Sequence, residues 1–207
     1  MTGLIPEPDG ATPLTDAELN GLRLPLLTRA ELNLAEAQNI GHAVSWLFSA
    51  RRPRPESVTT EAWLKNLHGR MYGEVWAWAG QYRTADRNLG VPYWQIHADM
   101  RNLEADAHAW LADTTSGRYG NDECAVRLGH RLVVIHPFPN GNGRWSRLAS
   151  DALVVALGAP RFTWGAGSLI EPTKLRRNYI AALQAADTDR DFAALIAFAR
   201  SQAYPAG

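Results

Sequence analysis

A histidine and an arginine flank a glycine-rich loop in the middle of the sequence. The segment 136–144 reads His-Pro-Phe-Pro-Asn-Gly-Asn-Gly-Arg. Gly141 and Gly143 allow the backbone to approach a ligand closely and to adopt positive φ angles. Arg144 offers a permanent charge on a planar fork that suits phosphate oxygens, and His136 can take a proton from a hydroxyl near neutral pH. Together these residue types indicate a phosphate-binding loop with a general base beside it.

The loop lies between two segments that have helical periodicity. Residues 123–135 repeat their apolar residues at helical spacing, and Pro137 disfavours helical geometry at His136. A second helix is predicted over residues 144–157, so the loop leads into its N-terminus, where unpaired amides and the positive end of the dipole favour an anion. Arg147, one turn into this helix, can point towards the same region. The spacing is not that of a Walker A loop.

The other elements that must position the loop are also mainly helical. Apolar residues recur at helical spacing in five further segments, namely residues 28–50, 59–71 and 99–111 and the segments that begin near 172 and 191. Residues 81–97 suit a short hairpin, in which Pro92 marks an exposed or edge strand. Residues 1–27 contain too many prolines for a regular element. The predicted organisation is an extended arm (1–27), a separate helix (28–50) and a mainly α domain (51–207).

Composition excludes several function classes. The chain has 207 residues, 46% hydrophobic and 20% charged, which is typical of a soluble globular protein. Its 21 basic residues balance 21 acidic ones without a basic cluster, so direct nucleic-acid binding is not expected. The single cysteine, Cys124, excludes an intrachain disulfide framework. Since there is neither a bilayer-length apolar run nor a signal-peptide pattern at the start, we expect a cytoplasmic protein without a membrane partner.

The loop pattern also has a purely structural interpretation. A histidine before a proline can end a helix, and Asn-Gly pairs are common in turns. From the residues alone, an anion site and an ordinary helix connection both stay open.

The loop resembles the signature of the Fic (Fic/Doc) family, His-Pro-Phe-x-Asp/Glu-Gly-Asn-Gly-Arg-x-x-Arg. The match runs from His136 to Arg147, with Asn140 at the acidic position as the one departure in its core. The similarity covers roughly residues 60–200, and within the family the chain resembles the branch called mobile mystery protein B. The resemblance implies a mainly α, Fic-like helical domain with a small β-hairpin flap.

The resemblance also implies an activity, AMPylation, in which AMP moves from ATP to a Ser, Thr or Tyr hydroxyl of a target protein. His136 would deprotonate the attacking hydroxyl. The phosphates would be held by Gly141, Asn142, Gly143, Arg144 and Arg147. Positioning and charge stabilisation do most of the work in phosphate transfer, so this small set of groups is chemically sufficient.

Two kinds of protein partner follow from the same resemblance. Residues 82–96 would be a flap that clamps the target chain by strand addition. Its predicted target-docking residues are Tyr82, Arg83, Tyr93 and Trp94. The branch further implies a small helix-turn-helix protein as partner, in a toxin–antitoxin-like pair.

Asn140 departs from the family pattern, in which an Asp or Glu ligates Mg²⁺. An amide oxygen can ligate a hard cation but lacks the charge that makes carboxylates good ligands. Mg²⁺ could be held by phosphates and water, bound weakly, or not used. Two alternatives to AMP transfer therefore stay open. One is a phosphotransferase or other nucleotidyl transfer with weak metal dependence, and the other is a degenerate nucleotide-binding regulatory module, against which the retention of His136 argues.

Glu36 is an acidic residue on the apolar stripe of the predicted 28–50 helix. If it is buried it needs a cationic partner, and Arg144 is a candidate. Many Fic proteins carry an inhibitory helix whose glutamate pairs with the motif arginine. Their motif, Ser/Thr-x-x-x-Glu-Gly/Asn, is matched here only at the glutamate, because Leu32 and Ala37 hold the other two positions. An inhibitory helix is one hypothesis, and a surface or structural glutamate is the other.

Overall fold

The computed structural model describes residues 15–25, 28–49, 53–165, 172–189 and 191–201, and it is mainly helical as predicted. Its elements are α1 (Asp16–Leu19), α2 (Arg29–Ser49), α3 (Pro55–Val58), α4 (Glu61–Tyr72), a 3₁₀ helix η1 (Tyr93–Gln95), α5 (Ile96–Thr115), α6 (Asn121–Ile135), α7 (Asn142–Ala156), α8 (Pro172–Asp189) and α9 (Ala193–Arg200). The first 14 residues of the predicted arm lie outside the described residues.

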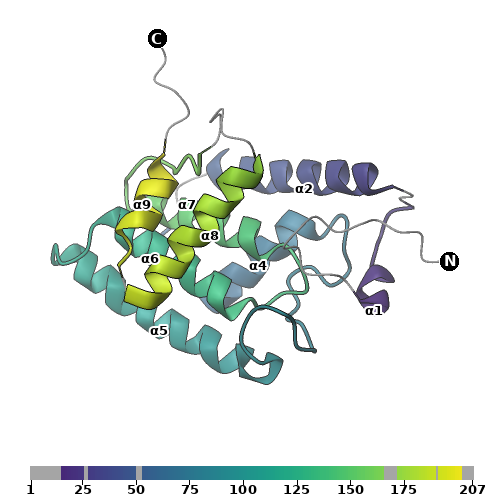
Figure 1. Ribbon diagram of the computed structural model, residues 1–207, viewed down its shortest axis with the longest axis horizontal. Helices are drawn as coiled ribbons and strands as arrows, with labels where there is room; N and C mark the ends of the chain where they lie inside the picture. The colour runs from purple at the N-terminus through teal and green to yellow at the C-terminus, as the bar shows by residue number, and fades with distance from the viewer. Residues whose placement is uncertain (1–14, 26–27, 50–52, 166–171, 190, 202–207) are drawn as a thin grey trace, which may run out of the picture.

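The helices α6 and α7 form the centre of the molecule and are joined by the glycine-rich loop (Figure 1). On α6, Leu128, Leu132 and Ile135 are fully buried, as their helical spacing predicts. Around this pair, α5 and α9 pack on α6, while α3 and α4 pack on α7. The loop is therefore held at both ends by helices that are anchored in the core.

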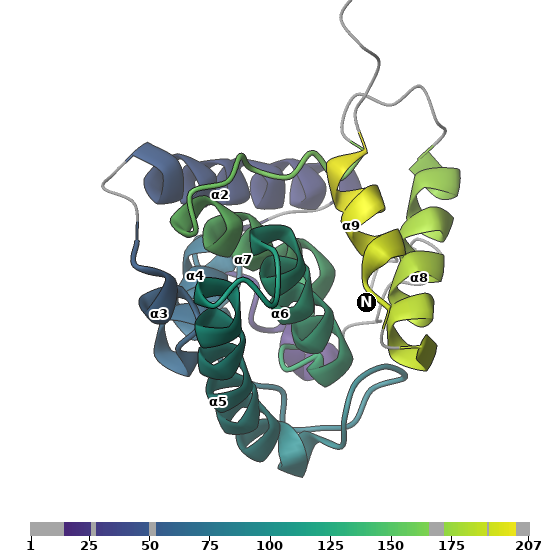
Figure 2. The same cartoon turned by 90° about the vertical axis from the view of Figure 1, so that its left-hand side faces the viewer.

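Helix α2 packs against α4 and runs across one end of the bundle (Figure 2). Its N-terminus has a capping box, in which the Thr28 amide donates to Glu31 Oε2 over 2.9 Å and the Glu31 amide donates to Thr28 Oγ1 over 3.2 Å. Asn39, only 2% exposed, bridges α2 to the end of α4. Its Nδ2 donates to the Arg70 carbonyl over 2.8 Å and its Oδ1 accepts the Glu74 amide over 3.0 Å. These bonds fix which face of α2 is turned inward.

The predicted hairpin does not form. Within residues 82–96 the backbone makes a loop and then η1, and among the described residues the β contacts amount to one isolated bridge between Leu22 and Trp76. Two backbone amides of this loop bond to carbonyls at and just after the end of α6. The Arg83 amide donates to the Pro137 carbonyl over 2.9 Å, and the Val91 amide donates to the Ile135 carbonyl over 3.3 Å. We call residues 82–92 the flap loop.

Two single-turn helices, α1 and α3, were not predicted. The first has a capping box between Thr15 and Glu18, and the second begins at Pro55, a favourable first helical position. Each is four residues long, which is too short for apolar periodicity to reveal. Among the described helices, none combines the length and the apolar character that a bilayer crossing requires.

Candidate functional site

Asn142 closes the loop between α6 and α7. The Phe138 amide donates to its Oδ1 over 3.0 Å, and its Nδ2 donates to the Phe138 carbonyl over 2.8 Å. The side chain is 1% exposed. Because both side-chain atoms are engaged in holding the loop, Asn142 can offer a ligand only its backbone amide.

Gly141 places the start of α7. Its φ is +80°, and a Cβ there would lie 2.5 Å from the Tyr72 ring, so a larger residue would not fit. Helix α7 begins at Asn142, two residues before the predicted start, which places the segment 142–144 in its first turn. First-turn amides have no partner inside the helix. Beside Gly143, no heavy atom lies within 4 Å of where a Cβ would be, so this side of the turn is open to a ligand.

His136 leaves α6 in a left-handed conformation, with φ +52° and ψ +57°. The Arg83 side chain holds this turn, because its Nε donates to the His136 carbonyl over 2.8 Å. The flap loop covers the residue, since a Cβ on Gly90 would lie 2.6 Å from the His136 Cβ. His136 Nδ1 is buried and makes no hydrogen bond of normal geometry within the described chain.

Burial lowers the pKa of His136 to about 4, although the Val133 carbonyl favours the protonated ring. The positive charges of Arg83 and Arg87 add to the lowering. The imidazole is therefore neutral near pH 7 and has a ring nitrogen free for a proton, and the low pKa makes it a weaker base than an exposed histidine.

Arg144 makes a salt bridge with Glu36, in which Nη2 and Oε2 are 2.8 Å apart. Trp76 Nε1 donates to the other carboxylate oxygen, Oε1, over 2.8 Å. The Glu36 side chain is 10% exposed and that of Arg144 is 41% exposed. Burial lowers the pKa of Arg144, but Tyr72 and Glu36 raise it on balance, so the guanidinium stays charged. The cationic partner predicted for a buried Glu36 is thus present, and α2 supplies the anion that faces the loop.

Arg147 lies against α8. Its guanidinium carbon is 5.3 Å from the centroid of the Tyr179 ring, a cation–π distance. The structure therefore brings Gly141, Arg144 and Glu36 together around Tyr72, with His136 at the other end of the same loop. Arg147 is packed on Tyr179.

Asn140 is directed at its own loop. Its Oδ1 accepts the Gly141 amide over 2.6 Å. In the described part of the chain, no group of three His, Cys, Asp or Glu residues is arranged to hold a metal ion. Hard divalent cations favour carboxylate ligands, and the carboxylate beside this loop, Glu36, is engaged with Arg144. This donor set does not fit a Mg²⁺ ion held by the protein itself.

His68 of α4 lies beside the loop and was not predicted from the sequence. It is fully buried, and its ring stacks on Phe138 with centroids 3.7 Å apart. Its Nε2 lies 3.1 Å from the Asn140 carbonyl, and the Gly80 amide donates to its Nδ1 over 3.0 Å. Burial lowers its pKa to about 3. A single histidine on an apolar helix face gives no signal that separates it from ordinary core residues.

The four predicted target-docking residues fall into two pairs. Arg83 is 3% exposed, and the Tyr82 hydroxyl donates to Glu61 Oε1 over 2.9 Å. Both therefore belong to the scaffold of the flap loop. Tyr93 and Trp94 are 41% and 63% exposed and form an edge-to-face pair with ring centroids 5.3 Å apart. Of the four residues, Tyr93 and Trp94 are the two with exposed side chains.

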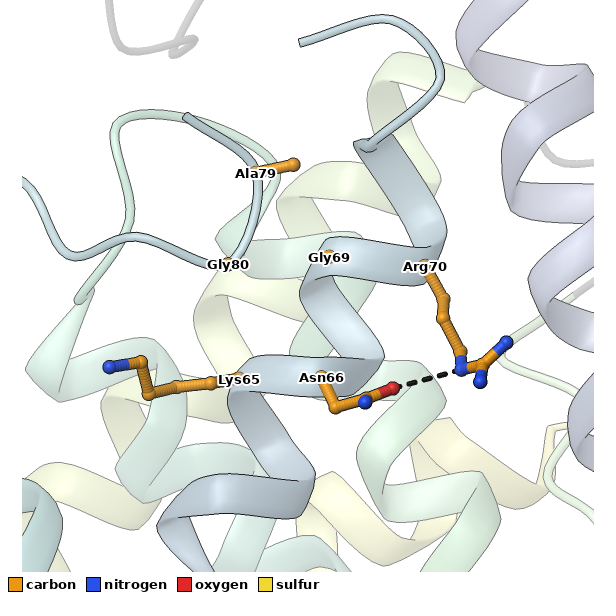
Figure 3. Close-up of a pocket in the computed structure, with 6 residues that line it drawn as sticks. All are labelled: Lys65, Asn66, Gly69, Arg70, Ala79 and Gly80. Carbon is orange, nitrogen blue, oxygen red and sulfur yellow. Dashed lines mark hydrogen bonds between the residues drawn. The ribbon is translucent and has the colours of Figure 1, made fainter. Parts of the chain in front are cut away.

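A hollow of about 450 Å³ lies on α4 (Figure 3). It is lined by Lys65, Asn66, Gly69, Arg70, Ala79 and Gly80. None of these residues belongs to the loop between α6 and α7.

Comparison with known proteins matches residues 58–154 to the Fic/DOC family. The protein adenylyltransferase fic-1 of Caenorhabditis briggsae is 32% identical over 83 residues, which are 40% of this chain and 15% of that protein. Residues 134–508 of Fic-1 from C. elegans align with a TM-score of 0.61 and 24% identity, covering 87% of this chain and 50% of that one. A VirB-translocated Bep effector from Bartonella quintana, solved with bound ADP, aligns with a TM-score of 0.63 and 17% identity. This alignment covers 88% of this chain and 94% of that one. This chain thus spans half or less of the first two relatives.

Proposed function

Since residues 58–154 belong to the Fic/DOC family, we propose that this chain transfers AMP from ATP to a Ser, Thr or Tyr hydroxyl of a target protein. The observation that carries the proposal is the pairing of a neutral, buried His136 with a glycine-rich helix start that leads into Arg144. The relative from C. briggsae is named a protein adenylyltransferase, and the B. quintana protein was solved with bound ADP. Both support a nucleotide as the co-substrate.

The proposed reaction uses few groups. His136 takes the proton of the target hydroxyl, and the oxygen of that hydroxyl attacks the α-phosphorus of ATP. The bond between the α-phosphorus and the bridging oxygen breaks, and pyrophosphate leaves with the electron pair. The backbone amides of Asn142 and Gly143 and the Arg144 guanidinium stabilise the phosphate charges. The Gly141 amide joins them when it exchanges Asn140 Oδ1 for a phosphate oxygen. Because the residues present do not fit a protein-held Mg²⁺, no step is assigned to the metal.

In the structure Arg144 is occupied by Glu36. A triphosphate that binds the loop must compete with this carboxylate for the guanidinium. In our proposal residues 28–50 are an inhibitory helix that acts on a catalytic domain of residues 51–207, and the chain rests in the inhibited state. The poor match of α2 to the family's inhibitory motif does not weaken the contact itself, which rests on a 2.8 Å salt bridge.

Target docking is proposed to use side chains of η1 and the flap loop. Arg83 Nη1 donates to the Ala85 carbonyl over 2.9 Å, and its Nη2 donates to the Val91 carbonyl. These carbonyls are therefore not available for strand addition. The exposed aromatic pair Tyr93 and Trp94, with the exposed Leu89 of the flap loop, supplies the contact surface in this proposal. The helix-turn-helix partner and the cytoplasmic location stay predictions from the sequence.

Asn140 favours a second candidate function. Without a carboxylate at this position, a transfer that depends little on a protein-bound metal, such as phosphotransfer, suits the loop as well. Intact-mass measurement separates the two candidates. The Glu36→Gly variant is incubated with ATP and Mg²⁺ and weighed, because self-modification needs no knowledge of the target. An added AMP mass supports AMP transfer and an added phosphate mass supports phosphotransfer. Absence of both adducts, with ATP still bound, would favour either an enzyme that modifies only its own target or the degenerate binding module.

The low pKa of His136 predicts an unusual pH dependence. A base with a pKa of about 4 is neutral throughout the range from pH 5 to 8. We therefore expect kcat to change by less than about twofold across this range, and to fall only as the pH drops towards 4. At the ordinary value of 6.5, protonation would lower kcat by about 30-fold at pH 5. The rate is measured in Glu36→Gly at saturating ATP, with ATP affinity determined at each pH. A fall centred near pH 6.5 would show that His136 is not held neutral.

A further inference from the structure

His68 connects two segments that are distant in sequence. Its Nδ1 accepts the Gly80 amide, just before the flap loop, and its Nε2 lies within hydrogen-bond distance of the Asn140 carbonyl in the phosphate loop. Since Nδ1 is occupied as an acceptor, the ring proton is on Nε2, which donates to Asn140. One imidazole thus ties the start of the flap loop to the turn that precedes Gly141.

The turn at Gly80 is built to reach this histidine. Gly80 has φ +77°, and a Cβ there would lie 3.0 Å from the Lys65 carbonyl oxygen and 3.4 Å from the Gly69 Cα. The backbone therefore rests directly on α4, as Figure 3 shows for Gly80 beside Gly69. This close approach lets the Gly80 amide point at a ring inside the core.

The other end of the contact sets the phosphate loop. Asn140 is followed at once by Gly141, whose left-handed conformation starts α7. The stacked Phe138 ring holds the imidazole in its plane from the loop side. A shift of the Asn140 carbonyl would move the peptide that starts the first turn of α7, and with it the amides that face a ligand. Displacements of about 1 Å in such groups can lower a rate by about 100-fold.

We propose that His68 is a positioning residue that fixes the amides of residues 141–143 through its bond to the Asn140 carbonyl. The proposal rests on the proposed function of this loop. His68 does not touch the reacting atoms. Its effect on the reaction passes through the loop backbone.

Two substitutions separate the two hydrogen bonds of the ring. In His68→Gln the terminal amide nitrogen takes the place of Nε2, so the bond to Asn140 can be kept while that to Gly80 is lost. In His68→Asn the side-chain oxygen takes the place of Nδ1, so the bond to Gly80 can be kept while that to Asn140 is lost. The exposed His108 on α5 provides the matched control, His108→Asn.

Hydrogen exchange of the Gly141 amide is measured first, because it requires neither nucleotide nor activity. This amide bonds to Asn140 Oδ1 and belongs to the same peptide unit as the Asn140 carbonyl. We expect about 10-fold faster exchange in His68→Asn than in His68→Gln, which corresponds to one lost hydrogen bond. The rate of ATP-dependent self-modification is measured next, in the Glu36→Gly background. We expect this rate to be at least about 10-fold lower with Asn than with Gln at position 68. The control is expected to change neither quantity.

If His68 only stabilised the fold, the exchange and transfer rates of the two variants would follow their stabilities. If exchange and rate followed the melting temperatures of the two variants, or if the two variants did not differ, the proposal would be overturned. Failure of the proposed function is distinguishable from this result. A split in exchange between the Asn and Gln variants without transfer in any variant would support the positioning role and refute the transferase.

Discussion

Glu36→Gly is expected to raise ATP affinity about 10- to 100-fold and to raise transfer at limiting ATP by a similar factor. The reason is the salt bridge between Glu36 and Arg144. Hydrogen bonds to charged groups contribute about 1.5–3 kcal/mol, and a competing phosphate must displace this one. Removal of the carboxylate leaves Arg144 free to bind the terminal phosphate. Calorimetry gives the affinity, and initial rates at several ATP concentrations give KM and kcat.

A gain could also come from loosening α2, since glycine inside a helix costs about 1 kcal/mol relative to alanine. Gln38→Gly, at an exposed position two residues away, weakens the helix equally and leaves the carboxylate in place. Glu36→Gln removes the charge but keeps an acceptor for Trp76 Nε1. We expect activation in both Glu36 variants and none in Gln38→Gly. Unaltered ATP affinity in both Glu36 variants would show that Glu36 has a structural role and does not inhibit ATP binding.

The sequence predicted those parts of the site that depend on neighbours in the chain. The glycine-rich segment 136–144 had to be a tight connection between two helices, and its amides had to open α7. Glu36 stood out because a charge on an apolar stripe is costly without a partner. Its pairing with Arg144, 108 residues away, agrees with that reasoning.

Contacts between distant segments could not be read from local patterns. Arg83 is the clearest case, because its side chain bonds the carbonyls of Ala85, Val91 and His136. This one residue turns a segment with hairpin-like residues into a loop fastened to the end of α6. His68 is a second case, since its two partners lie 12 and 72 residues away. Alternation and turn residues describe only what a segment favours on its own.

His136→Ala is expected to lower kcat by about 10²–10⁴-fold in the Glu36→Gly background, the range typical for loss of a general base. ATP affinity should stay within about twofold, because the phosphates are assigned to the amides of 141–143 and to Arg144. In the described structure His136 Nδ1 makes no hydrogen bond of normal geometry. Removal of the ring therefore leaves no partner of Nδ1 without its hydrogen bond. The fold should therefore persist. Single-turnover rates and calorimetric titration of ATP measure the two quantities separately.

The left-handed backbone at His136 requires a second variant. Alanine at φ +52° is strained, whereas asparagine adopts this region more readily. His136→Asn therefore keeps the turn and still removes the base. Equal loss of kcat in the Ala and Asn variants, with ATP binding retained, would assign the loss to proton transfer and not to a displaced loop. Substantial activity in His136→Asn would instead mean that the backbone conformation of this residue matters more than its imidazole, and the hydroxyl would then have to lose its proton to another group.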